Sequence, residues 1–121
     1  MGKYVIKDNG SGPYFVLKAG NGEPIGKSEN YSSKAACKNG IESVKKNAPA
    51  AKIEDQTVEG WKNLSNPVFE IYADKAGQFR FRLRAKNGEP ILASEGYKAK
   101  ASCENGIESV RKNAGSEIVE E

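Results

Sequence analysis

The feature that most constrains this chain of 121 residues is an internal repeat. Residues 14–48 align with residues 80–114 without gaps at an offset of 66, and 23 of the 35 positions are identical. The longest shared runs are Asn21-Gly22-Glu23-Pro24-Ile25 with Asn87-Gly88-Glu89-Pro90-Ile91, and Asn39-Gly40-Ile41-Glu42-Ser43-Val44 with Asn105-Gly106-Ile107-Glu108-Ser109-Val110. Self-similarity at a fixed offset indicates one structural unit that is present twice.

Each copy begins with a predicted set of three strands. They are expected at residues 3–7, 14–19 and near Pro24 in copy one, and at residues 68–73, 79–85 and near Pro90 in copy two. Apolar side chains and arginines alternate strictly over residues 79–85, which is typical of a strand with one buried face. An Asn-Gly pair follows the second strand of each copy, at residues 21–22 and 87–88, and predicts a hairpin with a type I′ turn.

The periodicity then changes from two residues to that of a helix. Apolar and small residues recur at i, i+3, i+4, i+7 and i+11, namely Cys37, Gly40, Ile41, Val44 and Ala48, and again Cys103, Gly106, Ile107, Val110 and Ala114. This spacing predicts a helix of about four turns in each copy. Ser33 is the expected N-cap of the first helix, whereas its counterpart Ala99 predicts a weaker start. A last short strand is predicted around Ile53 and around Ile118.

One copy alone offers few apolar residues for a core, so the two copies are expected to share one sheet. The predicted organisation is a single α+β domain over residues 1–121, with repeat one at 3–54, a connecting segment at 55–67 and repeat two at 68–119. The connecting segment holds the only tryptophan, Trp61, which is expected to anchor the segment against the body of the domain.

The repeat resembles that of the YegP-like proteins, a family of small proteins with a domain of unknown function. The residues that carry the resemblance in copy two are Phe79-Arg80-Phe81-Arg82-Leu83-Arg84-Ala85-Lys86-Asn87-Gly88-Glu89, Ile91-Leu92-Ala93-Ser94-Glu95-Gly96-Tyr97 and Asn105–Ala114. The same pattern stands in copy one at Phe15–Ala19, Ser28–Tyr31 and Asn39–Ile41. The resemblance implies tandem β(3)-α-β units that share one antiparallel sheet, with two helices on one face and the last strand of each unit swapped onto the other. It also implies a self-sufficient monomer, and it implies no activity.

One departure from the repeat lies in the third strand. Copy one has Gly26-Lys27 where copy two has Leu92-Ala93. The third strand of copy one is therefore expected to pack less well.

Composition excludes several kinds of protein. The net charge is only +3 and the charges are interleaved, whereas a dedicated nucleic-acid binder usually shows a larger or more clustered excess. The chain has two cysteines and no histidine, so the commonest general base and metal ligand are absent. We expect no cofactor, no metal, no catalytic residue and no membrane segment. Because the first residues do not resemble a signal peptide, we also expect a cytoplasmic location and reduced thiols.

The clearest candidate binding residues are three arginines on one face of a predicted strand: Arg80, Arg82 and Arg84. Such a row could bind phosphates or an acidic partner, although a solvated sheet face covered by arginine stems explains it as well. Copy one does not repeat the row, because it has Tyr14, Val16 and Lys18 at these positions. Tyr14 could stack on a base as in sheet-based RNA binders, and Lys18 would add a cation.

Three further motifs are better explained by packing. The Ser-Glu-x-Tyr motif, Ser28–Tyr31 and Ser94–Tyr97, could bind a small polar ligand. We expect instead that its tyrosine packs over the helix start while Ser or Glu satisfies free backbone N–H groups there. Gly40 and Gly106 are expected to allow a close approach between helix and sheet, and Cys37 and Cys103 are expected to be core residues.

These observations favour a non-enzymatic binding or interaction module whose ligand the sequence does not name. Its partner could be a protein or a nucleic acid. The alternative is weak nucleic-acid binding through the basic sheet face. An enzyme is the third hypothesis, and it lacks any set of residues that would fill the catalytic roles.

Overall fold

The computed structural model describes residues 2–121, so Met1, with which the predicted domain begins, lies outside it. Two helices and eight strands follow one another in the order β1 (Lys3–Asp8), β2 (Pro13–Lys18), β3 (Pro24–Lys27), α1 (Lys34–Asn47), β4 (Lys52–Asp55), β5 (Val68–Ala73), β6 (Phe79–Arg84), β7 (Pro90–Ala93), α2 (Lys100–Asn113) and β8 (Glu117–Glu120). Every predicted element is present, and each observed strand lies within a residue or two of its prediction.

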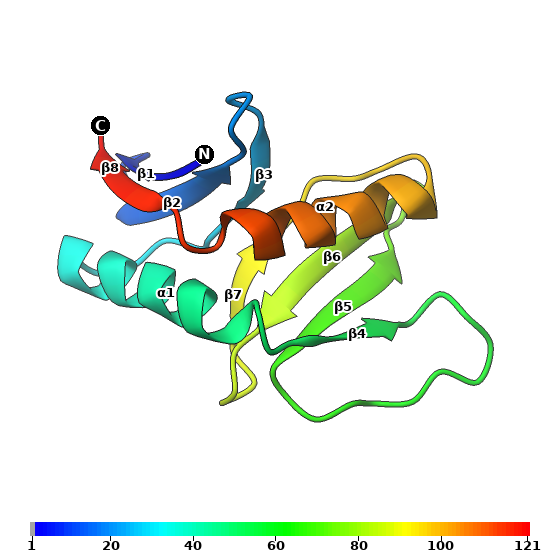
Figure 1. Ribbon diagram of the computed structural model, residues 1–121. Helices are drawn as coiled ribbons and strands as arrows, with labels where there is room; N and C mark the ends of the chain where they lie inside the picture. Colours follow the sequence, from blue (N-terminus) through cyan, green and yellow to red (C-terminus); the bar gives the residue numbers. More distant parts are fainter. Residues whose placement is uncertain (1) are drawn as a thin grey trace.

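All eight strands form one sheet in the order β4-β5-β6-β7-β3-β2-β1-β8. The last strand of repeat one, β4, pairs with the first strand of repeat two, and β8 pairs with β1 in the same way. Figure 1 shows β8 beside β1. The strand swap implied by the family resemblance is therefore confirmed.

The two swapped strands run parallel to their neighbours, while all other pairs are antiparallel. The sheet is thus mostly antiparallel rather than wholly so. A parallel pair needs a crossover of a dozen or more residues, because the chain must return to the same end of the sheet. Residues 56–67, between β4 and β5, supply this return, which explains why the repeats are joined by a long segment instead of a tight turn.

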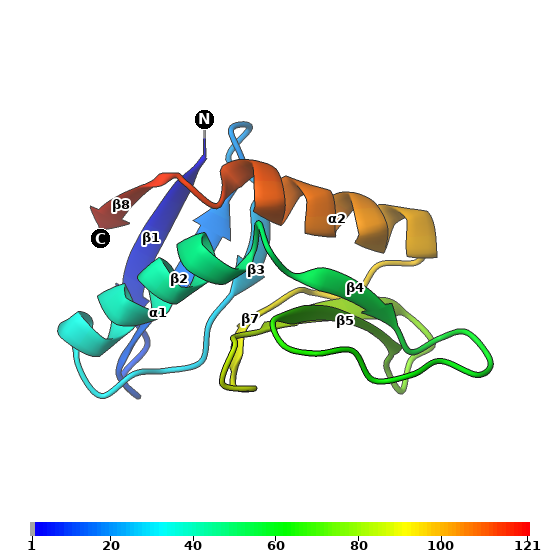
Figure 2. The same cartoon turned by 60° about the horizontal axis from the view of Figure 1, so that its bottom comes forward.

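Both helices cover the same face of the sheet (Figures 1 and 2). The core lies between this face and the helices, where the four largest fully buried side chains are Tyr4, Phe15, Phe69 and Phe81. Each helix contacts strands of both repeats, α1 on β2 and β7 and α2 on β6 and β3. The apolar surface that one repeat would leave open is therefore buried by the other.

The two repeats meet at β3 and β7, which are joined by a single residue pair, Lys27 opposite Ala93. Gly26 is buried at this seam, and a Cβ on it would lie 3.0 Å from Leu92 Cγ. The glycine was expected to weaken the packing of its strand. Instead it makes room for a leucine of the other repeat.

The hairpins after β2 and β6 are present, but their predicted turn type is wrong. Gly22 and Gly88 have φ angles of +85° and +86°, whereas no non-glycine residue among those described has positive φ. Type I′ would require positive φ at the preceding asparagine too. The observed three-residue loops each end on a glycine in the left-handed region, a form that adds a bulge to the strand. A register shift follows in β2 and β6 accordingly.

The connecting segment is not anchored by its tryptophan. The side chains of Val58, Trp61 and Leu64 are 45%, 42% and 40% exposed. The segment is held instead by a carboxylate, because Glu54 accepts a hydrogen bond of 2.6 Å from the Leu64 backbone N–H. Trp61 is therefore not the anchor that the sequence predicted.

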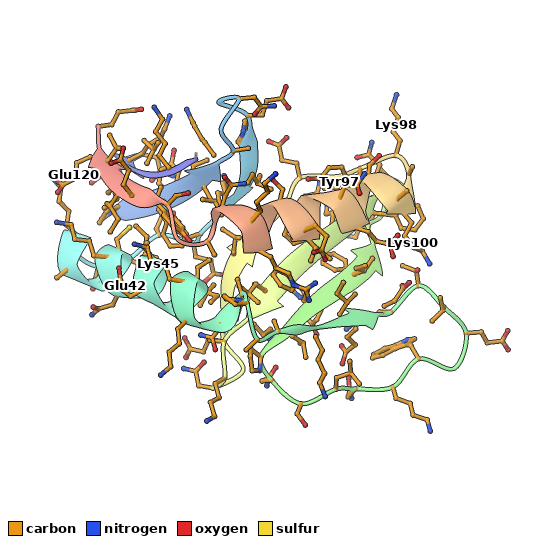
Figure 3. The ribbon with its side chains drawn as sticks, in the orientation of Figure 1. Glu42, Lys45, Tyr97, Lys98, Lys100 and Glu120 are labelled. Carbon is orange, nitrogen blue, oxygen red and sulfur yellow. The ribbon has the colours of Figure 1, made fainter. Side chains whose placement is uncertain are left out.

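Ion pairs join the start of each helix to the swapped strand of the sheet. Glu120 on β8 lies 3.1 Å from both Lys34 and Lys38 on α1, and Lys100 on α2 lies 2.9 Å from Asp55 on β4. Glu120 and Lys100 are labelled in Figure 3. Ser33 caps α1 through a hydrogen bond from Ala36 N–H, and Ala99 makes no such bond, as the sequence predicted.

Candidate functional site

The Ser-Glu-x-Tyr motif has a structural role. Ser28 Oγ accepts a hydrogen bond from the Phe15 backbone N–H, 2.9 Å away, and donates one to the carbonyl of Glu29. Ser94 does the same for Phe81 and Glu95. The serines therefore satisfy strand N–H groups rather than those of the helix start, which corrects the expectation from sequence.

The tyrosines of this motif explain the helix glycines. Tyr97 stacks on Phe81 and reaches α2, where a Cβ on Gly106 would lie 2.5 Å from its hydroxyl oxygen (Figure 3). Tyr31 lies over Gly40 in the same way. The close approach is thus between each helix and a tyrosine ring, and at Gly106 also with the sheet as expected, because Phe81 Cε2 of β6 would lie 3.0 Å from the added Cβ.

The two thiols are poor nucleophiles. Cys37 and Cys103 are free and fully buried. Burial raises the pKa of both, that of Cys103 to about 11, with a smaller contribution from Glu104. A buried thiol with a raised pKa is less reactive than an exposed one, because the thiolate is the nucleophile.

The remaining candidate residues lie on the face of the sheet that the helices do not cover, which we call the outer face. Here each arginine of the predicted row has a carboxylate partner. Arg80 Nε lies 2.7 Å from Asp74, and Arg82 and Arg84 both donate to Glu70 Oε1. Burial alone would raise the pKa of Glu70, but the hydrogen bonds and charges of its two arginines outweigh burial and hold the pKa below its usual range. The row is therefore largely neutralised within the chain.

A second buried carboxylate extends this network. Glu54 lies beside Glu70 on the neighbouring strand, and Gln56 Nε2 donates to both, at 2.7 and 3.1 Å. In the half of the sheet that comes mainly from repeat one, the equivalent cross-strand positions are Val119, Val5 and Val16. The two halves share a backbone but present different chemistry on the outer face.

A hollow of about 420 Å³, the first hollow, lies on the outer face over the seam between the repeats. Tyr14 from β2 and Tyr72 from β5 line it, together with Lys27 and Arg82. Lys27 Nζ lies 5.8 Å from the centre of the Tyr14 ring, and the Arg82 guanidinium lies 4.6 Å from that of Tyr72. Each ring thus carries a cation over its face, at a distance where the two attract.

A larger hollow of about 820 Å³, the second hollow, lies on the other side of the seam. Its cations are Lys7, Lys18, Lys27 and Arg80, and Glu95 is its one carboxylate. Lys27 therefore lines both hollows. Within residues 2–121 neither Lys18 nor Lys27 has a carboxylate within 4.0 Å, whereas Lys7 lies 3.5 Å from Glu121.

The structure places four of the five predicted candidates in the two hollows. Tyr14 and Arg82 line the first, Lys18 and Arg80 line the second, and Arg84 lines neither because it binds Glu70 and the carbonyl of Gly88. Sequence reasoning missed Lys27 and Tyr72. The sequence did point to Lys27, because the aligned repeats have a lysine at this position in copy one and Ala93 in copy two. This difference was interpreted as one of packing only.

The described part of the chain contains no group of three or more His, Cys, Asp or Glu side chains that could hold a metal ion. Among the same residues no helix is long and apolar enough to cross a bilayer.

The family described as a domain of unknown function (DUF1508) matches residues 8–55 and again residues 74–121. The chain belongs to this family. The UPF0339 protein YegP of Yersinia pestis is 38% identical over 100% of this chain and 96% of its own. A UPF0339 protein of Stutzerimonas stutzeri, from the 5′ region of a ptx operon, is 74% identical over 39% of this chain, a match that spans 42% of that relative.

A structure solved by experiment has a similar fold. The solution NMR structure of a protein of unknown function, yegP from E. coli, superposes with a TM-score of 0.79 at 33% identity, covering 98% of this chain and 91% of that one. These relatives support the fold and the duplicated unit. The names of these relatives describe no activity.

Proposed function

We propose that this chain is a binding module without chemistry of its own, and that it binds polyanions, single-stranded nucleic acid foremost, on the outer face. The observation that carries the proposal is the position of Lys27. It lies at the seam between the repeats, lines both hollows and has no carboxylate partner among the described residues. A lysine that lines both hollows and has no carboxylate partner within residues 2–121 is available for an anionic ligand.

The proposal that the chain catalyses no reaction is supported by the environment of its potential nucleophiles. The hydroxyls of Ser28 and Ser94 accept from strand N–H groups and donate to backbone carbonyls, and both thiols are buried with raised pKa. Reduced cysteines also fit the proposed cytoplasmic location. The chain is proposed to act as a monomer, because each swapped strand already has its partner within the same chain.

The proposal can be tested by fluorescence anisotropy with a labelled single-stranded oligonucleotide. Contacts to roughly two to four phosphates give a slope of about −1.4 to −2.8 in log K against log salt. Lys27→Glu is expected to weaken binding by about tenfold or more, which is about 1.4 kcal/mol, and to flatten the slope.

The matched control is Lys112→Glu, which makes the same charge change at an exposed position on α2, away from the outer face. It is expected to leave affinity nearly unchanged. Equal losses in the two variants would show that only net charge matters, and the proposed surface would then be wrong.

A further inference from the structure

The two hollows occupy equivalent positions in the repeats, yet their linings differ. When the repeats are aligned, Tyr14 of repeat one corresponds to Arg80 of repeat two, and Val16 corresponds to Arg82. In the first strands of the repeats, Lys7 on β1 corresponds to Tyr72 on β5. Both halves therefore have an aromatic ring opposite a cation on neighbouring strands, but in reverse order, Lys7 opposite Tyr14 and Tyr72 opposite Arg80.

The differences between the repeats are concentrated at these hollows. Twelve of the 35 aligned positions differ, and six of these twelve have at least one member in the lining of a hollow: 14/80, 16/82, 18/84, 26/92, 27/93 and 30/96. The core positions on β2, β6 and the inner faces of both helices are identical by contrast. Two hollows with the same backbone and different linings are not two copies of one site.

The first hollow has the chemistry of a site for a planar ring. Both outer-face tyrosines, Tyr14 and Tyr72, line it, and Ile91, Leu92 and Ala93 add apolar surface. The Arg82 guanidinium lies 4.6 Å from the centre of the Tyr72 ring, so a flat cationic surface is already in place. Nucleobases stack on tyrosine rings and on guanidinium planes. The volume, about 420 Å³, lies in the range of small-ligand sites.

The second hollow has the chemistry of a phosphate site. It has no aromatic side chain in its lining and is surrounded by Lys7, Lys18 and Arg80. Lys27 stands between the hollows, where it can contact a phosphate attached to whatever occupies the first.

We infer that the two hollows divide the recognition of one nucleotide unit, with the base in the first hollow between Tyr14 and Tyr72 and the phosphate in the second hollow on Lys18 and Lys27. This inference rests on the proposed function and deepens it, because a ringless polyanion would need only the second hollow. The nucleotide could be free or part of a strand, and both sources present the same base and phosphate.

The test is calorimetric titration with four probes: a short single-stranded oligonucleotide, an abasic strand of the same length, adenosine triphosphate and inorganic triphosphate. The abasic strand is expected to bind more weakly than the oligonucleotide. Tyr72→Leu is expected to lower the affinity for the oligonucleotide by about 5- to 150-fold, the value of one stacked base, and to leave the affinity for the abasic strand unchanged. Tyr72→Phe keeps the ring and is expected to bind normally, while Lys18→Gln weakens both strands by a similar factor.

Tyr14→Leu, in a different strand of the sheet, repeats the test if Tyr72→Leu does not fold. Adenosine triphosphate that binds as tightly as the oligonucleotide, and more tightly than inorganic triphosphate, identifies a free nucleotide as the ligand. Tight binding of the oligonucleotide alone identifies a strand. Equal affinity for the base-carrying and abasic strands would overturn the inference while the proposed function stands. Failure of every probe to bind would overturn both.

Discussion

Replacing Glu70 by glutamine is expected to change stability and binding in opposite directions. Glu70 has a side chain only 9% exposed and accepts hydrogen bonds from both Arg82 and Arg84, whose side chains are 34% and 30% exposed. Hydrogen bonds to charged groups are worth about 1.5–3 kcal/mol each. The amide oxygen of glutamine can replace one of them, and the partly exposed arginines can turn to water. We therefore expect a loss of about 1–3 kcal/mol in the free energy of unfolding.

The same substitution releases the positive charge of Arg82 beside the first hollow, so the affinity for single-stranded nucleic acid should rise. Each additional phosphate contact steepens the salt slope by about 0.7. Urea denaturation and anisotropy titration measure the two effects on one preparation. The control is Glu42→Gln on α1, an exposed residue 3.6 Å from Lys45 (Figure 3), which should change stability by less than about 0.5 kcal/mol. A Glu70→Gln variant that binds more weakly than the unaltered protein would refute the reasoning.

The remaining predictions concern pH, packing and exposure. Since the pKa of Glu70 is lowered from its ordinary 4.5, the stability difference between the protein and Glu70→Gln should be complete above that value and disappear as pH falls through the lowered pKa, which acid titration of urea unfolding measures. Gly106→Ala should destabilise, because overpacking against the Tyr97 ring costs about 1–3 kcal/mol and a helical alanine gains only about 1; Gly115→Ala, with nothing within 4 Å of its Cβ, should be neutral by the same assay. Cys103, with its pKa raised to about 11, should react with a thiol reagent at pH 8 only as fast as the protein unfolds. Trp61→Ala should change the free energy of unfolding by less than about 0.5 kcal/mol, since the side chain is 42% exposed; a loss several times larger would mean that the ring is anchored after all.

The fold could be predicted largely because the sequence contains the same structural unit twice, so that each pattern can be checked against its second copy. Strict alternation over residues 79–85 and the helical spacing from Cys37 to Ala48 are local patterns, and local patterns determine the type and position of an element. The type of the hairpin turn was not accessible, because Asn-Gly is compatible with a type I′ turn and with a longer loop that ends on glycine. The parallel direction of β4 and β8 was not accessible either, because it depends on how the chain crosses between repeats.

The site was only half predictable, for a reason that lies in the pairing of distant strands. Tyr14, Lys18, Arg80 and Arg82 were identified because alternation places them on the outward side of a strand. The ion pair between Arg82 and Glu70 was not foreseen, because Glu70 is on another strand of the sheet. Lys27 has no distinctive local sequence pattern. Its importance comes from its place opposite Ala93 at the seam, a contact between residues 66 positions apart.

Trp61 shows the limit of composition as a guide to burial. An apolar side chain in a segment that is neither glycine-rich nor highly charged predicts packing, but packing requires a free apolar surface within reach. On the nearby strands β4 and β5, Glu54 and Glu70 are joined by Gln56, and Trp61 remains 42% exposed.

The most direct test of the central claim is an amide-correlation NMR titration of labelled protein with a short single-stranded oligonucleotide, at low and then near-physiological salt. We predict shifts confined to the outer face, largest at Lys27 and its neighbours on β2, β3 and β6, that fade as salt rises. A spectrum that does not move, or one that moves only on the helices or the connecting segment, would contradict the claim that the outer face is the binding surface.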